Sequence, residues 1–145
     1  MKSKKLSEKI EKTFKNNGFV LSEPEVFLDS EYIIQRSGEG FRSSMLTFEN
    51  EKGKIMCLRP DLTVASCINF LQRGTNSKIY YSGQAYRRSR NKNFDFVHNQ
   101  LGIEIFGSKN VAQDDLKVVA TILNSVKKFK NKKIKIKVGD VSLFK

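Results

Sequence analysis

The stretch IYYSGQAYRRSRNKNFDFVHNQLGIEIFG (residues 79–107) decides the fold of this chain. Two β-rich runs flank a polar break at residues 91–93, a pattern that predicts an antiparallel hairpin. Alternate residues of a strand share a face, so Gln100 and Glu104 lie on one side with Gly102 between them. We expect these residues to form the floor of a small cleft, where an amide and a carboxylate can hold an ammonium group.

Length and composition bound the architecture. The chain has 145 residues, of which 39% are hydrophobic and 29% charged. This size predicts one domain that buries roughly two thirds of its unfolded surface. No apolar run reaches about 18 residues, so no membrane span is predicted. The N-terminal sequence lacks the apolar segment of a secretory signal, and we therefore expect a cytoplasmic protein.

Few residues are available for metal or disulfide chemistry. Cys57 and Cys67 are too few for a disulfide framework, and their spacing matches no zinc site. The chain contains a single histidine. We expect both cysteines to be small apolar residues in a reducing compartment, and we expect neither a metal site nor a cofactor.

The net charge of +12 favours polyanionic partners. Most of the excess is lysine that is scattered along the chain. A denser cluster, Arg87, Arg88, Arg90 and Lys92, lies at the tip of the predicted hairpin. One hypothesis is therefore an interaction module that binds RNA through this tip.

Periodicity and turn residues predict the remaining elements. The pattern predicts helices at residues 3–17, 62–73 and 108–130, and short strands at 19–21, 45–48, 54–58 and 132–140. Residues 28–44 fit no single pattern, and their second half is expected to be a loop. Pro24 predicts that the strand at 19–21 either lies at a sheet edge or stops there, because proline cannot donate a backbone hydrogen bond. The fold class is α+β, with a mainly antiparallel sheet flanked by helices.

The helix at 108–130 carries an apolar stripe. Its members recur at helical spacing and are Leu116, Val119, Leu123 and Val126. This spacing predicts that the stripe is the face that covers the sheet.

Asp61 and Thr63 lie where a predicted strand passes into a helix. Side chains at such a junction can reach into a cleft at the end of a sheet. They can equally cap the N-terminus of the helix, and the sequence leaves both roles open for them.

Three blocks together resemble the class II aminoacyl-tRNA synthetases, specifically the histidyl branch. NGFVLSEPEVF (17–27) resembles the first class II motif, LRPDLT (58–63) a histidine-binding segment, and residues 81–107 the second class II motif. The resemblance implies the N-terminal half of the class II catalytic-core fold. It also implies that residues 1–145 form one incomplete domain that lacks the third motif.

The resemblance also implies a histidine-binding site. Asp61, Thr63, Gln100 and Glu104 match positions that surround the amino group of histidine in that family. Two carboxylates, a hydroxyl and an amide carbonyl are all acceptors for an ammonium. Arg87 matches the arginine that contacts the α-phosphate of ATP and the substrate carboxylate, and a guanidinium fork suits both groups.

The chain departs from the synthetases in the residues that serve ATP. Ser89 occupies the position at which the synthetases carry a glutamate that holds ATP. Leu62 replaces the glycine between the acidic residue and the threonine of the histidine segment. These changes resemble the synthetase paralogues that serve as regulatory subunits of ATP phosphoribosyltransferase, the first enzyme of histidine biosynthesis.

That resemblance implies a non-catalytic subunit without catalytic residues. It would bind histidine, pair with a short-form catalytic subunit, take part in feedback inhibition, and form a homodimer within a hetero-oligomer. The alternative is a fragment of a histidyl-tRNA synthetase that activates histidine with ATP and charges tRNA. Nucleic acid is an expected partner only under that alternative or the RNA-binding hypothesis.

Overall fold

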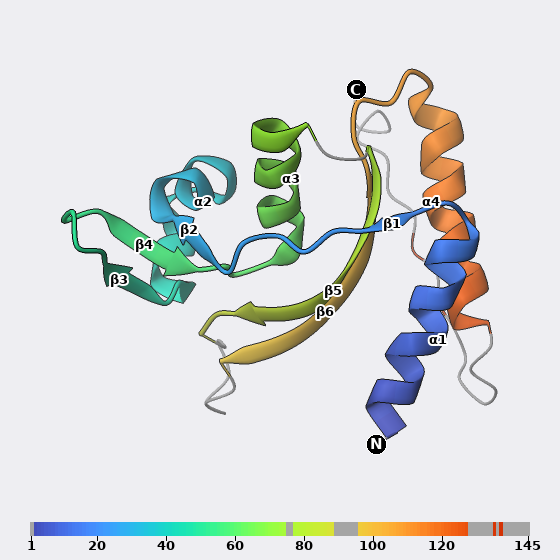
Figure 1. Ribbon diagram of the computed structural model, residues 1–145, viewed down its shortest axis with the longest axis horizontal. Helices are drawn as coiled ribbons and strands as arrows, with labels where there is room; N and C mark the ends of the chain where they lie inside the picture. Colours follow the sequence, from blue (N-terminus) through green and yellow to red (C-terminus); the bar gives the residue numbers. More distant parts are fainter. Residues whose placement is uncertain (1, 75–76, 89–95, 128–134, 136, 138–145) are drawn as a thin grey trace.

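The computed structural model describes residues 2–74, 77–88, 96–127, 135 and 137. The elements in chain order are α1 (Lys2–Asn16), β1 (Val20–Leu21), β2 (Phe27–Asp29), α2 (Ser30–Ser37), the 3-10 helix η1 (Glu39–Ser44), β3 (Thr47–Glu49), β4 (Ile55–Leu58), α3 (Leu62–Arg73), β5 (Lys78–Tyr86), β6 (Val97–Ile105) and α4 (Val111–Val126). In Figure 1 the long, curved β5–β6 ribbon lies between α3 on one side and α1 with α4 on the other.

The predicted hairpin is confirmed. β5 and β6 pair antiparallel along their whole length, from Lys78 opposite Ile105 to Tyr86 opposite Val97. β1 adds to the outer edge of β5 in parallel and ends before Pro24, as the sequence predicts for an edge strand. The polar break at residues 91–93 lies outside the described residues.

A second, smaller sheet has the order β2-β4-β3 and is antiparallel throughout. β3 and β4 correspond to the strands predicted at 45–48 and 54–58. The turn between them contains Gly53, whose φ of 75° is a conformation that favours glycine. β2 was not predicted, because a three-residue strand gives too short a pattern to recognise.

The ambiguous segment 28–44 contains a helix that the sequence did not predict. Asp29 caps α2, its side chain accepting a hydrogen bond from the backbone N–H of Glu31 at 3.0 Å. Ile33 and Ile34 bury α2 in the core with Leu28. A helix of eight residues is too short for its apolar periodicity to be distinctive.

The far side of the large sheet is covered by α1 and α4. Phe14 of α1 packs with Phe19, Tyr80 and Ile103 in a buried cluster. The predicted helix at 3–17 is therefore confirmed, and it packs through one stripe. The rings of Phe14 and Tyr80 meet at 6.0 Å between centroids, in a tilted arrangement suited to aromatic pairs.

The predicted face of α4 is only partly correct, because Leu123 and Val126 are half-buried but Leu116 and Val119 are not. Leu116 and Val119 are 69% and 46% exposed, whereas Thr121 and Ser125 are buried and Val118 packs against the core. The hydroxyl of Ser125 donates to a carbonyl within the helix, so its burial leaves no unmet hydrogen bond. Small side chains allow α4 to approach the sheet and α1 closely, and this packing overrides the apolar stripe.

Two further predictions concern a C-terminal strand and membrane-spanning helices. The strand predicted at 132–140 falls almost entirely outside the described residues. Among the described helices, none combines the length and the hydropathy needed to cross a membrane.

Arg59 joins the two sheets. Its guanidinium Nε donates to the carbonyl of Gln84 at 2.9 Å, and its Nη1 donates to the carbonyl of Pro24. The backbone N–H of Arg59 donates to Val26, and its carbonyl accepts from Tyr86. Arg59 therefore fixes the path from β4 into α3 against both β5 and the segment after β1.

We predict that Arg59→Ala lowers the free energy of unfolding by about 2–3 kcal/mol, because two carbonyls lose charge-assisted hydrogen bonds. Arg73→Ala is the matched control. Its guanidinium contacts the exposed Glu25 carboxylate, and exposed ion pairs contribute at most about 1 kcal/mol. Urea denaturation measures both variants, and equal losses would contradict the role given to Arg59.

Candidate functional site

The face of the hairpin that meets α3 carries the candidate residues. In the strand register Tyr81 lies opposite Gly102, Gly83 opposite Gln100, and Ile79 opposite Glu104. Alternation along each strand places these six residues on one face of the sheet. Gln100 and Glu104 therefore do share a face, as the sequence predicts.

The floor between Gln100 and Glu104 is not open. A Cβ atom on Gly102 would lie 2.3 Å from the hydroxyl oxygen of Tyr81, so the tyrosine occupies the space that glycine leaves. Tyr81 is only 3% exposed and packs with Leu62 and Ala85. The expected cleft floor is thus filled by a phenol that the sequence reading did not include in the site.

Tyr81 links two of the predicted site residues. Its hydroxyl lies 2.8 Å from Oγ1 of Thr63 and donates to Oε1 of Glu104 at 3.3 Å. Thr63 comes from the first turn of α3 and Glu104 from the end of β6. The tyrosine therefore connects the helix with the far strand of the hairpin.

Asp61 and Gln100 hold the N-terminus of α3. Oδ1 of Asp61 accepts from the backbone N–H of Val64 at 2.8 Å, and Oε1 of Gln100 accepts from the backbone N–H of Leu62 at 3.0 Å. The capping role left open for Asp61 is therefore confirmed. Gln100 supplies a second cap from the neighbouring sheet, which satisfies another N–H that the helix itself cannot pair.

The electrostatics of the site centre on Glu104. Burial raises its pKa above the ordinary value, the neighbouring hydroxyls of Thr63 and Tyr81 lower it, and the negative charge of Asp61 raises it again. The net effect is upward. Burial likewise raises the pKa of Tyr81 to about 12, so this phenol stays protonated at neutral pH. The site thus has an excess of negative charge that a cation would relieve.

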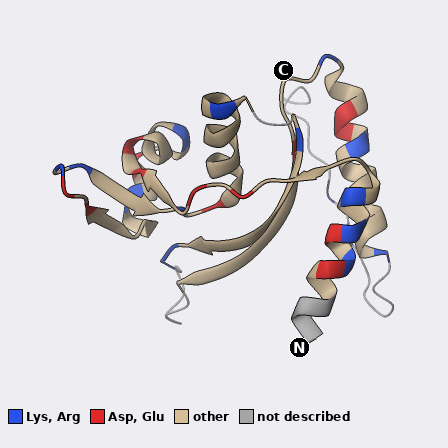
Figure 2. Cartoon of the chain, in the orientation of Figure 1, with Lys and Arg blue, Asp and Glu red and all other residues tan. Residues whose placement is uncertain are grey.

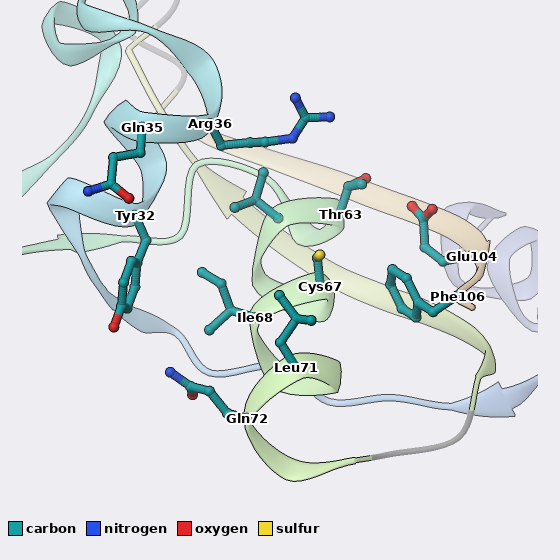
Figure 3. Close-up of a pocket in the computed structure, with 11 residues that line it drawn as sticks. Tyr32, Gln35, Arg36, Thr63, Cys67, Ile68, Leu71, Gln72, Glu104 and Phe106 are labelled. Atoms are coloured by element: carbon teal, nitrogen blue, oxygen red, sulfur yellow. The ribbon is translucent and has the colours of Figure 1, made fainter.

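Thr63 and Glu104 border a hollow of about 650 Å³ between α2, α3 and the end of β6 (Figure 3). Much of its wall is apolar. The residues that line it are Tyr32, Gln35, Arg36, Thr63, Val64, Cys67, Ile68, Leu71, Gln72, Glu104 and Phe106. A volume of this size, with few polar groups at one end, is typical of small-molecule sites.

Arg87 lies in a different hollow. This second hollow, of about 580 Å³, is lined by Gly40, Phe41, Ser43, Ser44, Arg87, Arg88 and His98. The structure therefore brings Asp61, Thr63, Gln100 and Glu104 together around the start of α3 and does not place Arg87 among them. Within the described residues, no group of three or more His, Cys, Asp or Glu could hold a metal ion.

Tyr81 is the site residue that sequence reasoning missed. The signal was present in the hairpin register, because pairing the two runs of residues 79–107 places Tyr81 opposite Gly102. A glycine paired opposite a large aromatic residue indicates that the aromatic ring lies across the glycine on the neighbouring strand.

Comparison with known proteins identifies similar chains. A family model described as Histidyl-tRNA synthetase matches residues 1–145. A curated ATP phosphoribosyltransferase regulatory subunit from Sinorhizobium medicae is 30% identical over 122 residues, which are 82% of this chain and 32% of that protein. One from Brucella ovis is 32% identical over 77% of this chain and 30% of its own length. The chain thus spans about a third of the length of these relatives.

Solved structures agree on the fold. A Bacillus halodurans ATP phosphoribosyltransferase regulatory subunit/histidyl-tRNA synthetase superposes with a TM-score of 0.73 at 20% identity, over 86% of this chain and 33% of that one. Apo histidyl-tRNA synthetase from S. aureus gives 0.70 at 19% identity, over 90% and 31%. The class II synthetase-like α+β fold expected from the sequence is confirmed.

We predict that Glu104→Gln raises the free energy of unfolding at pH 7. The folded pKa of Glu104 is raised, so ionising this group costs stability above that pKa, and the amide removes the cost while it can still accept from Tyr81. At about pH 4, below the ordinary glutamate pKa, the advantage should largely vanish. Urea denaturation at both pH values measures it, with the exposed Glu49→Gln as control. A gain that is independent of pH would contradict the assignment.

Proposed function

The chain belongs to the histidyl-tRNA synthetase family, and on that premise we propose that it is a histidine-binding, non-catalytic regulatory subunit of ATP phosphoribosyltransferase. It would support the first step of histidine biosynthesis and the feedback control of that step by histidine. Curated relatives at about 30% identity carry the name of this subunit. Since the chain spans about a third of their length, the activity is carried over as a proposal.

One observation supports histidine as the ligand: several acceptor oxygens lie close together at the start of α3. Glu104 and Thr63 border the larger hollow, and Asp61 lies close enough to Glu104 to raise its pKa. An ammonium has only donors, so a group of oxygens with excess negative charge suits it. The proposed partners of the histidine amino group are Asp61, Thr63, Gln100 and Glu104.

Gln100 and Asp61 would serve two purposes. Each already accepts a backbone N–H of α3, and each has further acceptor capacity, since a carboxylate or amide oxygen carries two lone pairs. Their positions are fixed before a ligand arrives. Preorganisation of this kind reduces the entropy that binding costs.

Arg87 would pair with the carboxylate of histidine. Its guanidinium must then reach beyond the hollow that Arg87 lines, toward the start of α3. A carboxylate is the group that a guanidinium fork recognises best, and Arg87 forms no ion pair with any other described residue. This role stays a proposal that depends on where the ligand carboxylate lies.

A regulatory subunit needs a catalytic partner, and the proposed partner is a short-form ATP phosphoribosyltransferase in a hetero-oligomer. Two copies of this chain would form a homodimer within it, in the cytoplasm. The absence of catalysis is proposed from Ser89, which replaces the glutamate that would hold ATP. Without that carboxylate, adenylation loses part of its electrostatic stabilisation.

A histidyl-tRNA synthetase function is the second candidate. The observation that favours it is the hollow with Arg87, Arg88 and Ser44, because two guanidinium groups and a hydroxyl suit phosphates. Histidine-dependent exchange between ATP and pyrophosphate separates the two functions. Exchange above background would establish the synthetase, and its absence with intact histidine binding favours the regulatory subunit.

We predict that the chain binds histidine and that Glu104→Ala weakens binding by about 1.5–3 kcal/mol, which is roughly 10-fold to 100-fold, because a charge-assisted hydrogen bond is lost. Titration calorimetry measures the affinity. Glu49→Ala on the exposed strand β3 is the control and should bind like the parent. An unchanged affinity for Glu104→Ala would remove this residue from the site.

We also predict association with a short-form catalytic subunit. Mixing the two should produce a larger species by size-exclusion chromatography and should change the rate at which ATP phosphoribosyltransferase turns over. Added histidine should then inhibit the mixture more than the catalytic subunit alone. If mixing changes neither the elution volume nor the rate, the proposed function is wrong.

A further inference from the structure

Three oxygen atoms form a row beside the larger hollow. The hydroxyl of Tyr81 lies in the middle, 2.8 Å from the hydroxyl of Thr63 and 3.3 Å from the carboxylate of Glu104. Each outer group borders the hollow, whereas the tyrosine is buried behind them. In Figure 3 Thr63 and Glu104 lie near each other at the same end of the hollow.

A count of protons sets the direction of this row. Each hydroxyl has one proton to donate, and an ionised carboxylate has none. Both contacts can be hydrogen bonds only if Tyr81 donates to Glu104 and Thr63 donates to Tyr81. In that arrangement both hydroxyl protons are used within the row.

We propose that Tyr81 is a positioning residue that directs the hydroxyl proton of Thr63 away from the hollow, so that Thr63 and Glu104 present only acceptors to the ammonium of a bound amino acid. This inference depends on the proposed function for the identity of the ligand. It does not depend on it for the behaviour of Glu104 in the free protein. Without Tyr81 the proton of Thr63 can turn toward the hollow, where it repels a cation.

Packing fixes the position of the tyrosine. Its ring lies over Gly102, where a Cβ would approach the hydroxyl to 2.3 Å, and it contacts Leu62 and Ala85. The hydroxyl therefore cannot leave the row without opening the contact between α3 and the hairpin. A buried, hydrogen-bonded hydroxyl with one allowed position is suited to orienting its neighbours.

Every element packed around Glu104 contributes to its charge balance. Asp61 and Thr63 face it from the start of α3, Tyr81 from β5, and Arg36, Tyr32 and Cys67 line the same hollow. Burial and Asp61 favour the protonated form of Glu104, and the two hydroxyls favour the carboxylate. Loss of the Tyr81 hydroxyl should therefore raise the pKa of Glu104 further. As the pH is lowered, Glu104 would then lose its charge, and with it the bound cation, at a higher pH than in the parent.

The test compares Tyr81→Phe with Tyr80→Phe. Both remove one buried phenol oxygen from β5, but Tyr80 lies on the opposite face, and within the described part of the chain its hydroxyl has no hydrogen-bond partner. Titration of the Glu104 carboxyl carbon by NMR in the ligand-free chain should give a higher pKa for Tyr81→Phe and the parent value for Tyr80→Phe. Equal pKa values in the parent and Tyr81→Phe would overturn the proposal.

Histidine affinity gives the second readout. Tyr81→Phe should bind about 3-fold to 10-fold more weakly, as expected for one neutral hydrogen bond, and the acidic limb of its binding profile should move to higher pH. A uniform loss at all pH values would indicate a structural role only and would overturn the proposal. If the parent does not bind histidine, the proposed ligand is wrong, and the NMR titration still decides the role of Tyr81.

A second variant, Thr63→Val, tests the proposal if Tyr81→Phe does not fold. Thr63→Val removes the donor to Tyr81 and keeps the shape of the side chain. The Tyr81 oxygen then no longer accepts a hydrogen bond from residue 63, so Tyr81 is a weaker donor to Glu104. The pKa of Glu104 should therefore rise again. An unchanged pKa in a folded Thr63→Val chain would contradict the proposed direction of the row.

Discussion

The structure depends on the contact between the N-terminus of α3 and the β5–β6 hairpin. A Cβ on Gly83 would lie 3.1 Å from Nη2 of Arg59 and 3.2 Å from Cδ2 of Leu62, the first residue of the helix, so the packing is tight at this glycine. Gln100 and Asp61 pair two backbone N–H groups there that the helix cannot pair itself. Arg59, two residues before Asp61, connects the same junction to the segment after β1 and to β5. The same contact between α3 and the hairpin places residues 61–63 beside residues 100–104.

Under the proposed function, stability and binding would depend on the same side chains. Gln100 and Asp61 stabilise the start of α3, and they are also proposed partners of the ligand ammonium. Glu104 differs, because its burial raises its pKa and so disfavours the ionised form in the folded chain. Under the proposed function, binding of the ligand ammonium would offset this cost, as in functional sites that sacrifice some stability.

The sequence predicted the hairpin, α1, α3, α4 and the strands β3 and β4 of the small sheet, because each has a repeating apolar pattern or is bounded by turn residues. It failed for β2 and α2, where three and eight residues give too little pattern, and in part for the packed face of α4. In α4, Thr121 and Ser125 are buried, and a pattern of apolar residues cannot predict the burial of polar side chains. In the site, the shared face of Gln100 and Glu104 followed from strand alternation alone. Tyr81 and the second hollow around Arg87 did not, since both depend on how distant segments pack.

The balance of charge at the α3 terminus explains why a cation is favoured there. A helix N-terminus carries roughly half a positive charge, which by itself would repel an ammonium. Asp61 caps that terminus and offsets the partial charge, so the charge of Glu104 is left over. Its nearest hydrogen-bonding neighbours, Thr63 and Tyr81, are neutral. An ammonium at the hollow would supply the missing positive charge and would lower the pKa of Glu104 toward its ordinary value. A neutral ligand of the same shape would leave Glu104 buried without a counter-charge, so under the proposed function an amino acid should bind more tightly than its uncharged analogues.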